Sequence, residues 1–281
     1  MCDGFRLEVM APRINKDTRL CISLSGRPSN IGTRFHNYLY DELGLDYVYK
    51  AFAPTDIEAA VTGIRGLGIR GAGVSMPFKE KVIPLVDVMH ESARAIDSVN
   101  TIVNEEGVLH AYNTDFQAVL DLLRDHGVDP ALSVAVAGSG GMAKAVVAAV
   151  REHGFTDVTV VARNEAAGTA LADRYGYVWR AGLGDSSPAA LINATPIGMA
   201  GGPDADALPF PSAAVEAATV VFDVVAMPPE TPLIRAGRAH GHTVITGAEV
   251  IALQAALQFA LYTGVTPTPD QVRRASEFSR S

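Results

Sequence analysis

The sequence predicts an α/β fold of two domains, one of them a Rossmann-type dinucleotide-binding domain. Segments typical of strands and helices alternate along the 281 residues, which indicates a mostly parallel sheet. The run Ser133–Ala137 is almost wholly apolar, as in a parallel strand buried on both faces. It leads directly into Gly138-Ser139-Gly140-Gly141 and a predicted helix, which is the order of a dinucleotide site. The length also fits one large or two ordinary domains, at roughly 100–200 residues each.

The first domain, for the substrate, is expected to comprise residues 1–114 and 246–281. Asp56 is expected to cap a helix that runs through Leu67, and Glu106-Gly107 is expected to turn a hairpin. Short apolar runs bounded by turn residues predict its strands at 20–24, 47–51, 69–75, 99–104 and 108–112. Its helices are expected at 32–43, 56–67 and about 79–95, and at 248–262 and 270–278, which fold back onto it from the C-terminal end.

The second domain is expected to comprise residues 115–245. Its opening helix is predicted to end at His126, with Gly127 as the stop. Residues 201–211 are rich in Gly, Pro and Asp and predict a surface loop. Its strands are predicted at 133–137, 157–162, 190–194 and 219–224, and its helices at 114–126, 141–153 and 165–175.

Composition excludes several classes of protein. The chain is 48% apolar and 19% charged, which is typical of a globular protein and not of a disordered one. Its 23 Lys+Arg against 31 Asp+Glu, a net charge of −8, argue against a nucleic-acid-binding protein. No apolar run approaches the roughly 20 residues of a membrane span, and Met1–Met10 has no apolar core of a signal peptide. The two cysteines, Cys2 and Cys21, imply no disulfide framework and fit a reducing cytoplasm.

The glycine-rich turn indicates how a dinucleotide would bind. Gly138, Gly140 and Gly141 allow the backbone to turn tightly and approach a pyrophosphate. The helix that follows would offer free N–H groups and the positive end of its dipole to the phosphates. A tight turn without a ligand is the alternative interpretation.

The residue after the next strand bears on the choice of cofactor. Sites for NAD usually place Asp or Glu there to bind the ribose 2′-hydroxyl, whereas Arg accommodates the 2′-phosphate of NADP. This chain has Arg163, followed by Asn164, so NADP is favoured. Glu165 lies close enough to leave NAD open, and Arg163 in solvent at the end of a strand is the other interpretation.

Candidate catalytic groups flank the predicted domain boundary. Lys79 follows the end of a strand, and Asp115 stands at the boundary itself. A cleft between domains is where substrate and nicotinamide would meet, and Lys and Asp there would form an acid/base pair. Spacing in the sequence does not establish this pairing. No metal site is expected, because His240 and His242 lack a third ligand nearby.

Several motifs, in this order along residues 19 to about 265, resemble the shikimate dehydrogenase family. They are Gly71-Ala72-Gly73-Val74-Ser75-Met76-Pro77-Phe78-Lys79, Ser98-Val99-Asn100-Thr101, Tyr112-Asn113-Thr114-Asp115, Gly138-Ser139-Gly140-Gly141, Ala162-Arg163-Asn164, Asn193-Ala194-Thr195-Pro196-Ile197-Gly198-Met199 and Gln254.

The resemblance implies a cytoplasmic shikimate 5-dehydrogenase-like, NADP-dependent oxidoreductase of the chorismate pathway of aromatic amino acid biosynthesis. Such an enzyme reversibly oxidises a ring hydroxyl to a ketone. The resemblance assigns catalysis to Lys79 and Asp115, with Asp115 orienting the Lys79 amine and the substrate hydroxyl. It implies that Asn100 and Gln254 hydrogen-bond substrate hydroxyls, and that Ser75, also expected to bind substrate, stands where the family has Thr or Ser. The cofactor residues that it implies are Gly138, Ser139, Gly140, Gly141, Met142, Ala143, Arg163, Asn164, Thr195, Met199 and Gly247.

The chain departs from the family where the substrate carboxylate binds. The family's Ser-x-Ser pair becomes Asn30 and Gly32, or Gly32 and Arg34, depending on the alignment, and its tyrosine becomes Ala226. Gly73 replaces the family's motif asparagine, and Phe116 and Ala118 replace glycines. Each hydrogen bond lost to a charged group costs about 1.5–3 kcal/mol. The hypothesis is a branch with a shifted or weakened preference for shikimate, in which a new acid- or polyol-binding group is formed by Arg27, Ser29, Asn30 or Arg34.

Other functions stay open at this point. A quinate/shikimate-type dehydrogenase that uses NAD, or a methylene-tetrahydrofolate dehydrogenase, would share the two-domain layout. A ligand-binding homologue with weak or no turnover is the non-enzymatic alternative, against which Lys79 and Asp115 argue. The expected partner is a small cyclic hydroxy acid, with no nucleic acid and no membrane. Monomer and homodimer are both compatible with the sequence.

Overall fold

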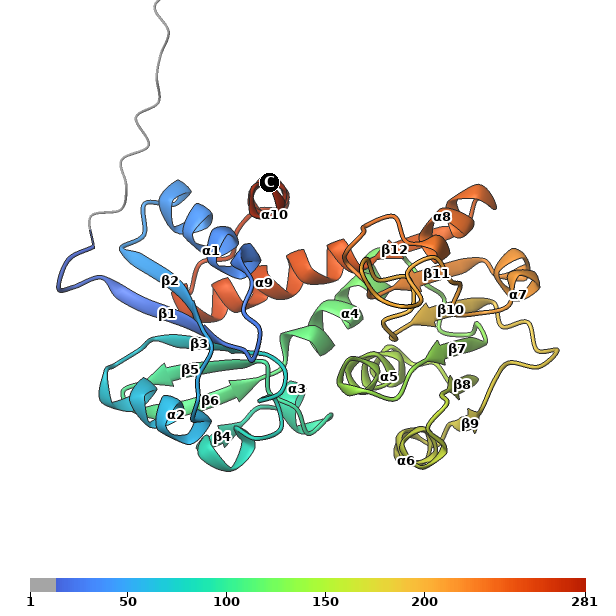
Figure 1. Cartoon of the computed structure of the whole chain (residues 1–281), viewed down its shortest axis with the longest axis horizontal. Coiled ribbons are helices and arrows are strands. Elements are labelled where there is room, and N and C mark those ends of the chain that lie inside the picture. Colours follow the sequence, from blue (N-terminus) through green and yellow to red (C-terminus); the bar gives the residue numbers. More distant parts are fainter. Residues whose placement is uncertain (1–13) are drawn as a thin grey trace, which may run out of the picture.

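A computed structural model describes residues 14–281. The expectations for Cys2 and for Met1–Met10 lie outside these residues. The described chain forms two lobes, each built on a six-stranded sheet with helices against it (Figure 1). The α/β class and the division into two sheets agree with the sequence prediction.

The first sheet has the strand order β2-β1-β3-β5-β6-β4. The pairs β1–β2 and β1–β3 are parallel, while β3–β5 and β5–β6 are antiparallel. Because of these directions, the ends of β1, β3 and β6 and the start of β5 meet at one edge of the sheet. The strands are β1 (Arg19–Leu24), β2 (Tyr47–Phe52), β3 (Gly71–Val74), β4 (Val88–Met89), β5 (Thr101–Glu105) and β6 (Val108–Tyr112).

The helices of the first lobe are α1 (Asn30–Glu42), α2 (Ile57–Gly66) and α3 (Glu91–Arg94). The predicted cap of α2 is confirmed, since the Asp56 carboxylate accepts from the N–H groups of Glu58 and Ala59. The predicted helix over 79–95 is wrong. A 3-10 turn (Ile83–Leu85), the short β4 and α3 occupy that stretch. Pro84 explains the failure, because proline has no N–H to donate and its ring obstructs the preceding helical turn.

The second sheet is wholly parallel, with the order β12-β11-β10-β7-β8-β9. The four predicted strands are present, with ends that differ by at most one residue. The sequence missed the edge strand β9, whose first and last residues are exposed, because three residues show no apolar alternation. The strands are β7 (Val134–Ala137), β8 (Val158–Val161), β9 (Val178–Arg180), β10 (Ala190–Asn193), β11 (Val220–Asp223) and β12 (Thr243–Thr246).

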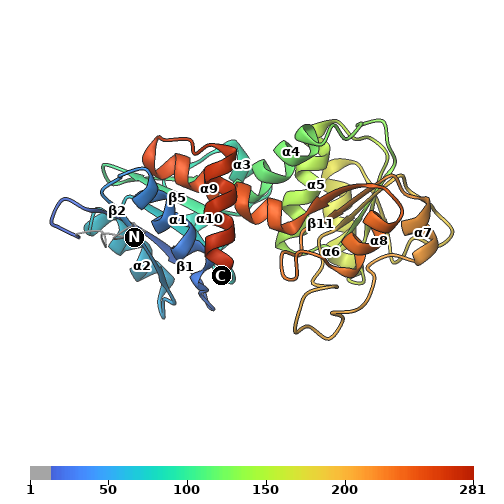
Figure 2. The ribbon, with the colours of Figure 1, turned by 90° about the horizontal axis from the view of Figure 1, so that it is seen from above.

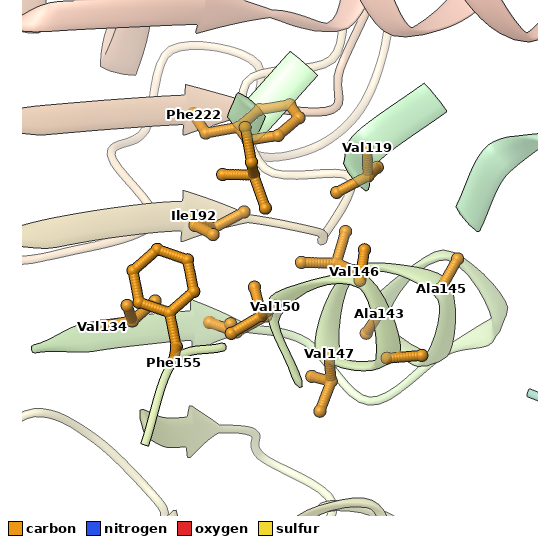
Figure 3. Packing of buried hydrophobic residues seen from close by; sticks show 14 of the residues in the cluster. Val119, Val134, Ala143, Ala145, Val146, Val147, Val150, Phe155, Ile192 and Phe222 are labelled. Atoms are coloured by element: carbon orange, nitrogen blue, oxygen red, sulfur yellow. The ribbon is translucent and has the colours of Figure 1, made fainter. Parts of the chain in front are cut away.

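Helix α5 packs along this sheet through small apolar side chains. Figure 3 shows Val146 and Val150 of α5 lying against Ile192 of β10, with Phe155 and Phe222 closing the same cluster. All five side chains are fully buried or nearly so. Helix α6 packs against β8 and β9, and α8 packs against β11 and β12, whereas α4 packs on α5 and α9 (Gly247–Thr263). The helices are α4 (Thr114–Asp125), α5 (Gly141–His153), α6 (Glu165–Tyr175), α7 (Ser212–Ala217) and α8 (Pro232–Ala239).

Two long helices connect the lobes: α4 and α9 (Gly247–Thr263), as Figures 1 and 2 show. Helix α9 belongs to both cores, because Val250 packs in the second lobe and Phe259 in the first. Helix α10 (Pro269–Arg280) then packs against α1. We propose that the domain boundaries lie at these two crossings, near residues 114 and 246. Within residues 14–281, no helix is both long and apolar enough to span a membrane.

Candidate active site

The edge where β3 ends and β5 begins carries the two predicted catalytic side chains. Lys79 follows the turn after β3 and is anchored by its carbonyl, which accepts from Val99 N at 3.0 Å. Asp115 lies in the first turn of α4, where the Asn113 side chain caps the helix. The Lys79 Nζ lies 2.5 Å from Asp115 Oδ2. The structure therefore brings together two residues that are 36 positions apart in the chain.

This ion pair remains accessible to a ligand. The side chains of Lys79 and Asp115 keep 24% and 14% of their exposure. Both groups are thus partly desolvated, and a small molecule at this edge can reach both. An amine can transfer a proton to or from a substrate hydroxyl, and a carboxylate in contact with the amine can hold it in position.

Asn100 is held next to this pair by a dense set of hydrogen bonds. Its Oδ1 accepts from Thr114 N and Thr101 Oγ1, each at 2.8 Å. Its Nδ2 donates to Thr114 Oγ1 at 3.0 Å. The side chain is only 3% exposed, so this network determines its orientation. Asn100 consequently ties the start of β5 to the start of α4.

Helix α9 adds two glutamines to the same region. Gln254 and Gln258 lie one turn apart and so share a helix face. Thr114 Oγ1 donates to Gln254 Oε1 at 3.3 Å. The buried Gln258 donates from Nε2 to the Asn100 carbonyl at 3.1 Å and to Thr101 Oγ1 at 2.9 Å. No role was predicted for Gln258 from the sequence, although its four-residue spacing from Gln254 was an available signal.

The serines and asparagine assigned to the substrate lie on exposed loops at the same edge. Ser75 immediately follows β3, and its N–H donates to the Leu24 carbonyl at 2.9 Å. The loop after β1 is joined to it by Gly26 N, which donates to the Met76 carbonyl at 2.9 Å. Ser29 and Asn30 are exposed at the start of α1. Ser29 occupies the N-cap position without a side-chain hydrogen bond to the helix, so its hydroxyl is available to a ligand.

The two arginines considered for an acid-binding group, Arg34 and Arg27, lie in different surroundings. Arg34 points at α10, where its guanidinium lies 5.0 Å from the Phe278 ring and donates to Ser281 Oγ at 3.4 Å. Arg27 is exposed in the loop before α1. Ala226, in the loop after β11, is half-buried.

The position of Gly73 is filled by a tyrosine. A Cβ at Gly73 would lie 2.9 Å from the hydroxyl oxygen of Tyr49 and 3.5 Å from Ser23 Cβ. Tyr49 is 3% exposed, and burial raises the pKa of its hydroxyl, so that it remains protonated. The Tyr49 hydroxyl therefore occupies the volume in which a side chain at position 73 would lie.

The carboxyl ends of β7, β8 and β10 surround a cavity of about 1090 Å³. Gly138 has φ +120°, and a Cβ there would come within 2.9 Å of the Ala194 carbonyl oxygen, so glycine is required. At Gly140 and Gly141 a Cβ would meet nothing within 4 Å, which leaves the turn open to a phosphate. Of the predicted cofactor residues, the cavity is lined by Gly138, Ser139, Gly140, Arg163, Asn164 and Thr195.

The remaining predicted cofactor residues lie outside that lining. Gly141 begins α5, Met142 packs half-buried, and Ala143 is fully buried in the core. Met199 is 42% exposed. Gly247 lies so close to the backbone of Val224 and Val225 that a Cβ would approach within 2.5 Å, which explains the glycine by packing. The sequence missed other parts of the wall, which come from loops rich in Gly and Pro: Gly182–Gly184, Asp204 and Pro209–Pro211.

The histidines before β12 and the predicted cofactor residue Asn164 complete the set of predicted site residues. No group of three or more His, Cys, Asp or Glu in residues 14–281 is arranged to hold a metal ion. His242 Nε2 lies 2.8 Å from the Val215 carbonyl oxygen. Asn164 caps α6, since its side chain accepts from Ala167 N at 3.0 Å. Its place in the cavity is thus fixed by the start of that helix.

Comparison with known proteins gives one family. The model of the shikimate dehydrogenase substrate binding domain matches residues 30–102. A shikimate dehydrogenase-like protein of Haemophilus influenzae is 53% identical over 268 residues, which cover 95% of this chain and 99% of that protein. The shikimate dehydrogenase (NADP(+)) of Rubrobacter xylanophilus is 37% identical over 280 residues, covering 94% and 97%.

Comparison with solved structures identifies the same family. A shikimate 5-dehydrogenase-like protein, 53% identical, matches with a TM-score of 0.94 and covers 95% of this chain and 100% of its own. Shikimate 5-dehydrogenase of Thermus thermophilus in complex with NADP(H) and shikimate is 29% identical, with a TM-score of 0.83 and coverage of 93% and 99%. Quinate dehydrogenase of Corynebacterium glutamicum in complex with NAD is 27% identical, with a TM-score of 0.84 and coverage of 93% and 98%. The resemblance seen in the sequence motifs is thereby confirmed, and the chain belongs to the shikimate dehydrogenase family.

Proposed function

We propose that this protein is an NADP-dependent oxidoreductase that reversibly oxidises a ring hydroxyl of shikimate or a related cyclic hydroxy acid. The observation that carries the proposal is the contact of 2.5 Å between Lys79 Nζ and Asp115 Oδ2. A ligand-binding protein without turnover has no need of an accessible amine–carboxylate pair. The cavity at the glycine-rich turn, in the other lobe, would hold the cofactor.

The side chains of this edge suit alcohol oxidation. When bound, NADP supplies or accepts the hydride. As the carbon of the ring alcohol loses its hydride, Lys79 in its neutral form takes the hydroxyl proton, and in reduction Lys79 returns it. Asp115 holds the Lys79 amine and orients the hydroxyl towards it. Asn100 and Gln254, which are joined through Thr114, position neighbouring ring hydroxyls.

The preference for NADP rests on Arg163, which follows β8 and lines the cavity. A guanidinium is a planar, permanently charged donor suited to a phosphate. The relatives named shikimate dehydrogenase (NADP(+)) support the same choice. Use of NAD is the alternative, since a quinate dehydrogenase of the same fold was solved with NAD.

We propose that the substrate differs from shikimate at the end remote from Lys79, or that the enzyme accepts such compounds in addition to shikimate. The serine pair and the tyrosine of the family are absent, and Tyr49 fills the space beside Gly73. The exposed loop with Ser29 and Asn30 is the candidate replacement. The relative with 53% identity is itself named as a shikimate dehydrogenase-like protein, which agrees with a branch of altered substrate preference.

The test is steady-state oxidation of shikimate, quinate and related cyclic polyols with NADP and with NAD, by the wild-type protein and by Lys79→Ala. Rapid, Lys79-dependent oxidation of shikimate with NADP would establish a shikimate dehydrogenase and contradict the altered substrate preference. Slow oxidation of shikimate, with a faster cyclic hydroxy acid in the panel, would support the altered preference. Cofactor binding without turnover of any compound would favour the ligand-binding homologue.

A further inference from the structure

A second arginine lies beside the cofactor cavity, on the strand next to Arg163. Ala137 of β7 pairs with Val161 of β8, and Val161 pairs with Arg180 of β9. Residues that pair in register on neighbouring strands project from the same face of a sheet. Ala137 and Val161 both line the cavity. Arg180, third in this row, therefore projects from the cavity face.

The residue before Arg180 confirms this direction. Trp179 packs on the opposite face, where its Nε1 donates to the Ala162 carbonyl at 3.1 Å and its ring lies against Gly168 of α6. Since successive side chains of a strand alternate, Arg180 points away from α6. The chain continues directly from Arg180 into residues 181–184, which form one wall of the cavity.

The two arginines stand close together. Ala162 N donates to the Arg180 carbonyl at 3.1 Å, so the ends of β8 and β9 are joined beside Arg163. Neighbouring strands lie about 4.8 Å apart, a separation that two arginine side chains readily span. Both arginines are exposed, and among residues 14–281 neither forms an ion pair with a carboxylate. Arg180 donates only a long hydrogen bond, 3.3 Å, to Ser186 Oγ.

Acidic side chains near the cavity are Glu165, in the first turn of α6, Asp185, in the loop after β9, and Asp204, which lines the cavity. All three are exposed, and solvent screens their effect on the arginines. Two unpaired guanidinium groups at one cavity edge suit a dianionic ligand better than the single hydroxyl of a ribose.

We propose that Arg180 is a specificity residue of the cofactor site, which together with Arg163 clamps the 2′-phosphate of NADP. This inference rests on the proposed function, since it assumes that the cavity binds a nicotinamide dinucleotide. It adds a determinant from β9 to the arginine that the sequence identified after β8. The phosphate would replace Ser186 as the acceptor for Arg180.

The experiment measures binding and needs no turnover. Trp179 is the single tryptophan of the chain, and its fluorescence is titrated with NADPH and with NADH for the wild type, Arg180→Ala and Arg180→Lys. The expected result for Arg180→Ala is about tenfold weaker binding of NADPH and NADH binding within about twofold of wild type. Arg180→Lys is expected to fall between, because it keeps the charge and loses the forked geometry.

Arg238→Ala is the matched control, because it removes the same charge from α8, where Arg238 pairs with Glu230. It should change neither affinity. Equal weakening of NADPH and NADH by Arg180→Ala, or no weakening, would overturn the role of Arg180 while leaving the proposed function intact. Failure of the wild type to bind either dinucleotide would overturn the proposed function and this inference together. Competition by 2′,5′-ADP against 5′-AMP checks that the 2′-phosphate carries the difference.

Discussion

The two ends of the proposed substrate site are built in different ways. At the catalytic end, defined by Lys79, Asp115, Asn100 and Gln254, side chains are buried or half-buried and joined by hydrogen bonds across four segments of the chain. At the loop end, defined by Ser29 and Asn30, side chains are exposed. The catalytic end retains the family's motifs, whereas the loop end departs from them.

This difference shows which part of the site tolerates change. At the catalytic end each polar group satisfies another, so one substitution leaves a buried partner without its hydrogen bond. Side chains of surface loops form few such buried hydrogen bonds, so substitutions there cost little stability. A protein of this fold can therefore acquire a new substrate by changing the loop end while the chemistry at the catalytic end is preserved.

The largest expected effect is at the catalytic pair. Lys79→Ala should lower kcat/KM by about 10²–10⁴, the usual contribution of a general acid–base group. Asp115→Asn should lower it less, because Asp115 positions the lysine. Both are measured by steady-state kinetics on the best cyclic hydroxy acid found, with Lys81→Ala, at an exposed neighbouring position, as the control. A Lys79→Ala enzyme of undiminished rate would refute the assignment of the catalytic end.

The second prediction concerns His36, which lies in α1 behind the loop end. It is 1% exposed and stacked on Tyr49 with centroids 4.3 Å apart. Burial lowers the pKa of His36 from 6.5 to about 3. Between pH 6.5 and 3, His36 is therefore protonated in the unfolded chain and neutral in the folded chain. The free energy of unfolding consequently decreases as the pH falls through 6.5 towards 3. Near pH 5 the expected loss is about 2 kcal/mol, close to 30-fold in the folding equilibrium.

Urea denaturation at pH 5 and 7.5 checks this prediction, with His36→Gln as the variant that cannot take the proton. The wild type should lose more stability than His36→Gln on acidification. Equal pH dependence of the two proteins would show that the loop end does not rest on a neutral, buried histidine.

Asp223, in the second lobe, should show the opposite sign. It is fully buried, and desolvation raises its pKa from 3.8 to about 6, although Thr231, Val225 and Asn193 donate to it. Its contribution to stability is therefore present in acid and lost as the pH rises through about 6. Between pH 5 and 7.5 the loss should be about 1 kcal/mol. Comparing the pH dependence of Asp223→Asn with that of the wild type measures it; the reverse sign would contradict the assignment.

The fourth prediction compares one residue type at the two ends. Asn100→Ala should lower kcat/KM at least about tenfold, because it removes hydrogen bonds to Thr114 and Thr101 within a buried network. Asn30→Ala should change kcat/KM with shikimate by no more than about threefold, since the side chain is exposed. Steady-state kinetics and thermal denaturation of both variants separate activity from folding. A larger effect at Asn30 would reverse the comparison and make the loop end the dominant contact.

The smallest expected effect is on the contact between lobes next to Lys79. Lys144 Nζ of α5 lies 2.7 Å from Glu80 Oε1. The Glu80 side chain is 63% exposed, so the pair is screened and contributes little. Glu80→Gln should raise KM about two- to threefold at low salt and have no effect at high salt. Asp97→Asn, which breaks the second pair between lobes, Arg174–Asp97, is the control; a large change in kcat would contradict this minor role.

Local chemistry in the sequence was sufficient to predict much of the fold. The cap at Asp56, the hairpin turn at Glu106-Gly107 and the glycine-rich turn before α5 each depend on residues adjacent in the chain. The predicted helix over 79–95 failed because Pro84 outweighed the apolar spacing. Edge strand β9 was missed because its three residues show no apolar alternation, so only its pairing with β8 in the fold identifies it.

The sequence by itself determined the α/β class, the dinucleotide turn and the identity of Lys79 and Asp115 as candidates, since each depends on residue type and local order. Only the tertiary structure decided that Lys79 touches Asp115, that Gln258 bonds the backbone at Asn100 and that the Tyr49 hydroxyl fills the space beside Gly73. It also placed the Arg34 guanidinium against Phe278 of α10. Such contacts join segments far apart in the chain, and they depend on how the strands of the sheet are ordered and how α9 packs across them.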